Sequence, residues 1–124
     1  MKTIVVVNNE QNIAVLLQFH LERAGYRVRV YGRGVNALAG LIEEACDLVI
    51  LDSYNPPLGG VTLLRELRKH CKTPVILLSP HADDIAQELR GTELDAADYI
   101  ASPFSMEDVV ARVKKVLERR NDAV

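Results

Sequence analysis

Short apolar runs alternate along the whole chain with stretches whose apolar residues recur at helical spacing. The five runs are Thr3–Val7, Tyr26–Tyr31, Leu48–Leu51, Val75–Ser79 and Tyr99–Ala101. Runs of this length, bounded by turn residues, are typical of strands. Strands that alternate strictly with helices form parallel βαβ units, with right-handed crossovers and helices on both faces of the sheet. The sequence therefore predicts an α/β domain with a three-layer, doubly wound, five-stranded parallel sheet.

The ends of two predicted helices carry recognisable signals. Gly25 follows the first helical stretch and is a good C′ residue, and Ser105 is a good N-cap for the last helix. The chain has 124 residues, which suits one domain with one core. We expect a single domain over residues 1–120, with residues 121–124 as a C-terminal tail or the start of a linker.

Composition excludes several classes of function. The net charge is −2, which argues against a protein that binds the nucleic-acid backbone. The basic group Arg65, Arg68 and Lys69 has acidic neighbours and reads as a solvated helix face. No apolar run is long enough to span a membrane or to serve as a signal peptide. Cys46 and Cys71 show no metal-binding spacing, so we expect free thiols in a cytoplasmic protein.

Polar residues follow the predicted strands, at the edge of the sheet where ligands bind in doubly wound proteins. They are Asn8, Asn9, Asp52, Ser79 and Ser102. Asp52 is the one carboxylate that directly follows a buried strand. From local sequence alone, Asp52 suits a functional carboxylate and a turn-capping aspartate about equally well.

Read from end to end, the chain resembles the receiver domains of two-component response regulators. Three segments carry the resemblance: "DLVILDSYNPPLGG", "TPVILLS" and "AADYIASPF". The resemblance implies a flavodoxin-like fold with strand order 2-1-3-4-5. It also implies five site positions: the phosphoacceptor Asp52, the loop residues Pro56 and Gly60, the switch hydroxyl of Ser79 and the switch aromatic Tyr99.

The chain departs from the family's pattern at three places. Asn8 and Asn9 stand where the family usually has an acidic pair that holds a divalent ion, and Ser102 stands where it usually has a lysine. Pro80 follows the switch hydroxyl, at the phosphoryl-binding loop, where the family uses a backbone N–H that proline lacks. The asparagines also have a simpler reading, because Asn8 or Asn9 could begin the first helix as its N-cap.

These departures weaken the chemistry of phosphoryl transfer, which depends on positioning and charge neutralisation. Mg²⁺ prefers oxygen ligands that include carboxylates, and an asparagine carbonyl supplies only a dipole. We expect no metal site and no cofactor, with Mg²⁺ binding weak or absent. The weak candidates for a ligand are Asp52, Asn9 and the carbonyl of Tyr54. Ser102 offers a neutral hydrogen bond where a lysine would make a stronger, charge-assisted one.

The sequence thus predicts a signalling module and not an enzyme. The main hypothesis is an atypical receiver in a phosphorelay that acts through protein–protein contacts. Its partner would be a histidine kinase or a downstream effector, without nucleic acid or membrane, and as a monomer or weak homodimer. The surface would include Ile85, Leu89, Tyr99 and the last helix. The alternative is a functional phosphoacceptor, modified on Asp52, with a relaxed metal site.

Enzymes and cofactor proteins of the same architecture are disfavoured. The segment after the first strand lacks both a flavin-type phosphate loop and the GxGxxG of dinucleotide-binding proteins. A dehalogenase-type phosphatase would need a second aspartate at position 54, which is a tyrosine. His20 lies on the apolar stripe of the first helix, and we interpret it as a packed, hydrogen-bonded side chain.

Overall fold

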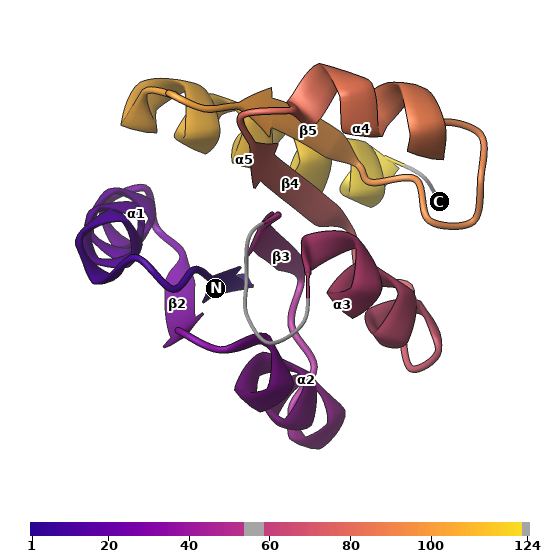
Figure 1. The fold of residues 1–124 in the computed structure, drawn as a ribbon. Helices are drawn as coiled ribbons and strands as arrows, with labels where there is room; N and C mark the ends of the chain where they lie inside the picture. Colours follow the sequence, from indigo (N-terminus) through magenta and orange to yellow (C-terminus); the bar gives the residue numbers. More distant parts are fainter. Residues whose placement is uncertain (54–58, 123–124) are drawn as a thin grey trace.

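Five strands alternate with five helices in the computed structural model, which describes residues 1–53 and 59–122 (Figure 1). The elements are β1 Thr3–Val7, α1 Gln11–Arg23, β2 Arg27–Tyr31, α2 Gly34–Glu43, β3 Leu48–Asp52, α3 Gly60–Arg68, β4 Val75–Ser79, α4 Ala82–Leu89, β5 Asp98–Ala101 and α5 Met106–Asp122. All strand pairs are parallel, and the order across the sheet is β2-β1-β3-β4-β5. The predicted doubly wound fold and its strand order are confirmed.

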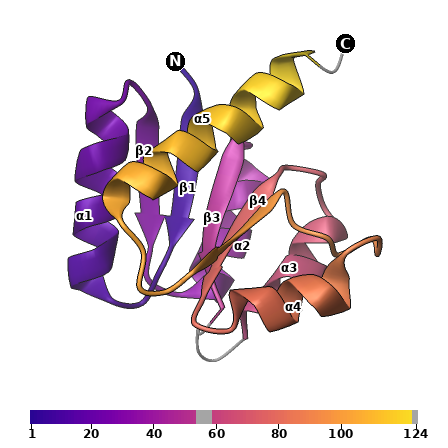
Figure 2. The same cartoon turned by 90° about the horizontal axis from the view of Figure 1, so that it is seen from above.

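The sheet separates two layers of helices, each with its own apolar core. Helices α1 and α5 cover one face, and α2, α3 and α4 cover the other (Figure 2). Alternate residues of the strands point to opposite faces, so Ile4 and Val6 pack under α1 and α5 while Val5 and Val7 pack under the other three helices. Both faces of the sheet are therefore covered, which explains the continuous apolar runs.

The helix ends agree with the sequence signals in two places and differ in one. Gly25 follows α1 with a φ of +101°, and the Oγ of Ser105 accepts the N–H of Asp108 at the start of α5. The N-cap of α1 is Glu10 and not Asn8 or Asn9, so the N-cap reading of the asparagines is wrong. Helix α5 continues past residue 120, where we expected the domain to end; the boundary itself stays a prediction.

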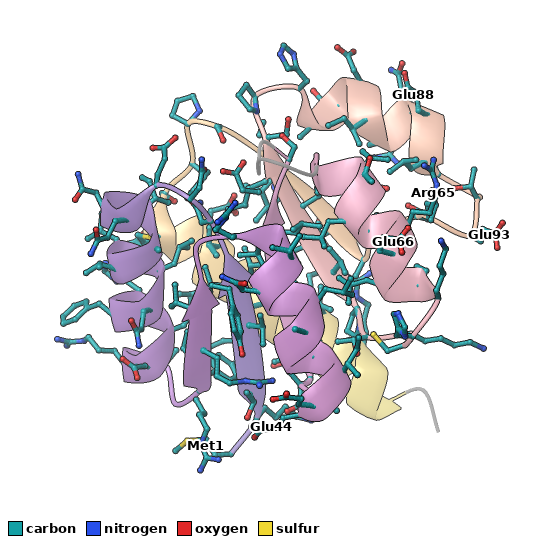
Figure 3. All side chains as sticks on the ribbon, turned by 60° about the horizontal axis from the view of Figure 1, so that its bottom comes forward. Met1, Glu44, Arg65, Glu66, Glu88 and Glu93 are labelled. Atoms are coloured by element: carbon teal, nitrogen blue, oxygen red, sulfur yellow. The ribbon has the colours of Figure 1, made fainter. Side chains whose placement is uncertain are left out.

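The surface carries mixed charges where the sequence shows basic groups. The Nζ of Lys69 lies 3.0 Å from a carboxylate oxygen of Glu66. Arg65 and Glu93 line the same shallow surface pocket, and Figure 3 shows both beside Glu66 on one side of the molecule. Arg65 and Lys69 are exposed, as the sequence predicted, whereas Arg68 is half-buried and donates from Nη1 to the Thr73 carbonyl at 2.8 Å.

Cys46 and Cys71 are partly buried free thiols, packed against the core under α2, α3 and α4. Within residues 1–53 and 59–122, no helix has the length and apolar character needed to cross a membrane.

Candidate functional site

The carboxyl ends of the strands surround a pocket of about 540 Å³. Its walls come from the turn after β1, helix α1, the ends of β3 and β4, the segment that joins β5 to α5, and the first residue of α5. The lining residues are Asn8, Glu10, Ile13, Leu16, Asp52, Leu78, Pro80, Ser102, Pro103, Phe104 and Met106. Four residues singled out from the sequence, namely Asn8, Asp52, Pro80 and Ser102, are therefore brought together.

Asp52 is the last residue of β3 and is partly buried at the pocket. It pairs with Leu78 of β4, which is buried and also lines the pocket. The carboxylate thus sits where a buried strand reaches the sheet edge, as the sequence indicated. Tyr54 and Pro56, which were named as a candidate ligand and as the loop proline, lie outside the described residues.

The two asparagines after β1 play different parts. Asn8 is buried, and its Oδ1 accepts the backbone N–H of Glu10 at 2.8 Å. Its own N–H donates to the carbonyl of Tyr31 at 3.1 Å, which continues the pairing of β1 with β2. Asn9 is exposed and does not line the pocket. Asn8 therefore closes the turn into α1 by a side-chain hydrogen bond, a common role for asparagine.

Ser79 ends β4 and is almost completely buried. Its Oγ accepts the backbone N–H of His81 at 3.0 Å, and its carbonyl accepts the N–H of Ser102 at 3.0 Å. Pro80 lies between Ser79 and His81 and lines the pocket without an N–H to offer. The hydroxyl of Ser79 thus supports the turn into α4.

Tyr99 lies in β5, and its hydroxyl makes hydrogen bonds to residues that precede that strand. The hydroxyl donates to Asp95 Oδ1 at 2.9 Å and accepts the N–H of Ala96 at 2.9 Å. Burial raises the pKa of the Tyr99 phenol, so the hydroxyl stays protonated and can donate. Among the described residues, no hydrogen bond joins Tyr99 to Ser79, and Tyr99 does not line the pocket.

An arginine that the sequence analysis did not single out ties α5 to β5. Arg112 donates from Nη1 to Asp98 Oδ1 at 3.1 Å and to the Tyr99 carbonyl at 3.0 Å. Its Nε donates to Asp108 Oδ1 at 3.2 Å, one turn earlier on α5. Only the last contact has a sequence signal, the i,i+4 spacing of Asp108 and Arg112.

Apolar side chains make up most of the described pocket wall, and apart from Pro80 the sequence analysis singled out none of them as site residues. Ile13 and Leu16 come from α1, Phe104 comes from the segment that leads into α5, and Met106 is the first residue of α5. The Ser102–Pro103 peptide bond in this segment is cis. A wall of this kind depends on how α1 and α5 meet in space, which no local pattern reveals.

A sequence profile of one family, the response regulator receiver domain, matches residues 4–114. The chain belongs to this family. The receiver resembles two curated bacterial regulators. It is 40% identical over 118 residues to the alkaline phosphatase synthesis transcriptional regulatory protein PhoP of Bacillus subtilis. It is 38% identical over 121 residues to the transcriptional regulatory protein GltR of Pseudomonas aeruginosa.

Each match covers 95% of the receiver, which spans about half the length of these relatives (49% and 50%). Solved structures agree in fold. A Francisella response regulator 1452 receiver domain has a TM-score of 0.85 and 30% identity, covering 97% of this receiver and 99% of that chain. A CheY-like receiver domain protein from Methanospirillum hungatei has a TM-score of 0.90 at 23% identity, covering 100% and 99%, and shows the fold alone.

The described side chains around Asp52 offer Mg²⁺ few anionic ligands. Residues 1–53 and 59–122 contain no group of three histidine, cysteine, aspartate or glutamate side chains placed to hold a metal. Asp52 and Glu10 are the carboxylates in the pocket wall, and the Oδ1 of Asn8 already accepts a backbone N–H. Mg²⁺ demands near-octahedral oxygen ligands and gives up its bound water reluctantly, so proteins usually hold it through one or two carboxylates together with several waters.

Proposed function

We propose that this chain is an atypical receiver domain that signals through contacts with protein partners and has impaired metal-dependent phosphorylation on Asp52. Response regulator receivers are signalling domains that interact with histidine kinases and effectors. In this receiver, phosphoryl transfer to Asp52 would be weaker than is usual in the family.

One observation carries the proposal, and it concerns charge. The described residues that line the pocket around Asp52 include no lysine and no arginine, and Glu10 adds a second carboxylate. A phosphoryl group gathers negative charge on its oxygens, and enzymes stabilise it with cations and positioned N–H groups. Here Ser102 supplies a hydroxyl and Pro80 supplies no N–H. Phosphorylation of Asp52 would thus place a phosphoryl anion in the same pocket as the Glu10 carboxylate, without a described cationic side chain to offset the charge.

The proposed output surface is the face formed by α4, β5 and α5. Arg112 joins β5 to α5 through Asp98 and the Tyr99 carbonyl, so the two elements form one unit. Ile85 of α4 and Tyr99 are partly buried against the same core, whereas Leu89, which we expected on this surface, is only 8% exposed and belongs to that core. A partner that binds this unit can recognise the arrangement of β5 and α5 without a phosphoryl group at Asp52. The domain would act as a monomer or weak homodimer, within residues 1–120.

The alternative, a functional phosphoacceptor with a relaxed metal site, draws support from a separate observation. Asp52 ends β3 at the sheet edge, and the buried Ser79 ends the adjacent strand β4. A phosphoacceptor and a switch hydroxyl on adjacent strands would need this arrangement, which supports the alternative. In this case Mg²⁺ or a small cation would bind with Asp52 despite the missing carboxylates.

The deciding experiment compares the native chain with a variant in which the asparagine pair and Ser102 are replaced by the residues usual in the family, while Pro80 is kept. Asn8→Asp, Asn9→Asp and Ser102→Lys would supply two carboxylates and one cation. Both proteins are treated with acetyl phosphate with and without Mg²⁺, and acyl-phosphate is measured by intact mass. The proposal predicts no phosphorylation of the native chain and Mg²⁺-dependent phosphorylation of the triple variant. The triple variant with Asp52→Ala should lose it.

Efficient Mg²⁺-dependent phosphorylation of the native chain, lost in Asp52→Ala, would overturn the proposal in favour of the alternative. Because Asn8 is only 6% exposed, the triple variant requires a check of its fold. Circular dichroism and a thermal melt serve this purpose. Asn9→Asp with Ser102→Lys, which leaves Asn8 unchanged, is the second variant if the triple variant is unstable.

A further inference from the structure

The pocket at the sheet edge has the size of a site for a small organic molecule. Its volume of about 540 Å³ lies within the range of roughly 300–1,000 Å³ that is usual for such sites. Figure 2 shows α1 beside the first turns of α5, and these two helices supply Leu16 and Met106 to the wall. Such a space is larger than a phosphoryl group and a metal ion require.

The wall divides into an apolar part and a polar end. Leu16, Leu78, Phe104 and Met106 form much of the apolar part. At the polar end lie Asp52, Ser102 and Asn8, whose side-chain oxygen is held by the N–H of Glu10. Binding sites for small molecules combine these same parts, an apolar surface for affinity and a few fixed polar groups for orientation.

The charge of the wall selects the kind of ligand. Asp52 and Glu10 are anionic, and the described lining contains no cationic side chain. The N-terminus of α5 also faces this region, but its first turn carries Glu107 and Asp108, which offset the positive end of the helix dipole. An anion therefore meets repulsion in the pocket, whereas an ammonium group meets a carboxylate and makes a charge-assisted hydrogen bond.

We propose that the pocket binds a compact organic amine, with the apolar body against Leu16, Phe104 and Met106 and the ammonium group at Asp52. The amine would cover the phosphoacceptor position and bridge α1 to the segment before α5. This ligand site goes beyond the proposed function and does not rest on it, because the pocket is present whether or not Asp52 accepts a phosphoryl group.

Three probes with the same ring test the proposal. Tryptamine carries an ammonium group, indole is neutral and indole-3-acetate is an anion. Each is titrated into ¹⁵N-labelled protein, and amide shifts are followed at Asn8, Asp52, Ser102 and Met106. We expect saturable shifts at these residues with tryptamine, and an affinity for tryptamine at least about tenfold above that for indole-3-acetate. Indole should fall between the two.

Two comparisons test where the amine binds: Leu16→Lys against Val15→Lys, and Asp52→Asn against the native chain. Leu16 lines the pocket and is 45% exposed, whereas Val15 is 55% exposed on the same helix and does not line it. Leu16→Lys should weaken tryptamine binding at least about tenfold, and Val15→Lys less than about twofold, because both add the same charge but only one adds it to the wall. Asp52→Asn should reduce tryptamine affinity to that of indole while leaving indole binding unchanged.

Three results would overturn the proposal. They are the absence of saturable shifts with tryptamine, equal affinities for the three probes, and equal effects of Leu16→Lys and Val15→Lys. Phosphorylation of Asp52 in the native chain would overturn the proposed function but not the amine site. The impaired phosphorylation and the amine site are therefore tested by different results.

Discussion

Gly60, at the start of α3, lies directly against Ser53, which follows β3. The N–H of Gly60 donates to the Ser53 carbonyl at 2.8 Å, and a β-carbon on Gly60 would lie 2.5 Å from the Ser53 Cα. It would also lie 2.9 Å from the Asp52 carbonyl oxygen. All these atoms belong to the backbone, so they cannot rotate away as a side chain would.

Gly60→Ala should therefore lower the free energy of unfolding by about 1–3 kcal/mol, the usual range for forcing an extra group into a packed site. Urea denaturation measures the change. Gly59→Ala is the matched control, because a β-carbon there meets nothing within 4 Å, and it should change stability by no more than about 0.5 kcal/mol. Equal effects of the two substitutions would contradict the close approach to Ser53.

Asn8→Ala should destabilise the domain by about 0.5–1.5 kcal/mol, because it removes the hydrogen bond from the Glu10 N–H to the Asn8 side chain. Asn9→Ala should change stability by less than about 0.5 kcal/mol, since Asn9 is exposed. Asn8→Asp keeps an acceptor oxygen and tests whether the hydrogen bond or the amide group matters. A larger loss for Asn9 than for Asn8 would contradict these roles.

Cys46 should react slowly with alkylating reagents at neutral pH. Burial raises the pKa of its thiol from 9.0 to about 11, which keeps the reactive thiolate scarce. In a Cys71→Ser background, the rate of alkylation by iodoacetamide should rise with a midpoint near pH 11, and in urea-unfolded protein near pH 9. A folded midpoint at or below pH 9 would be inconsistent with the burial of Cys46.

The same raised pKa has a consequence for stability. The thiol of Cys46 loses its proton more easily in the unfolded chain than in the folded one. The protonated Cys46 thiol therefore stabilises the folded state fully below pH 9, and this stabilisation is lost as the pH rises from about 9 to about 11. Replacing Cys46 with alanine should flatten the fall in unfolding free energy across this window, compared with the native chain. An unchanged slope would show that the thiol does not contribute.

Arg112→Met should destabilise the domain by about 1–2 kcal/mol, mainly through the lost hydrogen bond to the Tyr99 carbonyl. The ion pair with Asp98 contributes less, because both side chains are partly exposed. Lys115→Met, on the exposed side of α5, is the control and should change stability by less than about 0.5 kcal/mol. High salt should reduce the effect of Arg112→Met without abolishing it, since salt screens only the ionic part.

Local patterns sufficed to predict the fold class. Apolar runs such as Val75–Ser79 are too short and too continuous for exposed helices, and strict alternation with helices leaves few topologies. Gly25 and Ser105 marked helix ends because each supplies a property that few other residues have, a left-handed backbone and a capping oxygen. The order of the strands followed from the resemblance to receiver domains and is confirmed by the structure.

The site was predictable only in part. Asp52, Asn8 and Ser102 meet because strand ends meet at one edge, which topology alone requires. The sequence could not tell an N-cap from an Asx turn at Asn8, since both use the same side-chain oxygen and differ in position by a residue or two. The interpretation of His20 as a hydrogen-bonded core residue stays a prediction; the ring lies half-buried, edge-on to Phe19.

The hydrogen bond from the N–H of Ser102 to the Ser79 carbonyl joins two strand ends through main-chain atoms. Any residue except proline can occupy position 102 and still donate that N–H, and every residue at position 79 has the carbonyl. This contact between β4 and the segment after β5 therefore does not depend on which side chains occupy positions 79 and 102. Evolution can therefore replace the side chains at these strand ends one at a time while the main-chain hydrogen bond between the strands is kept.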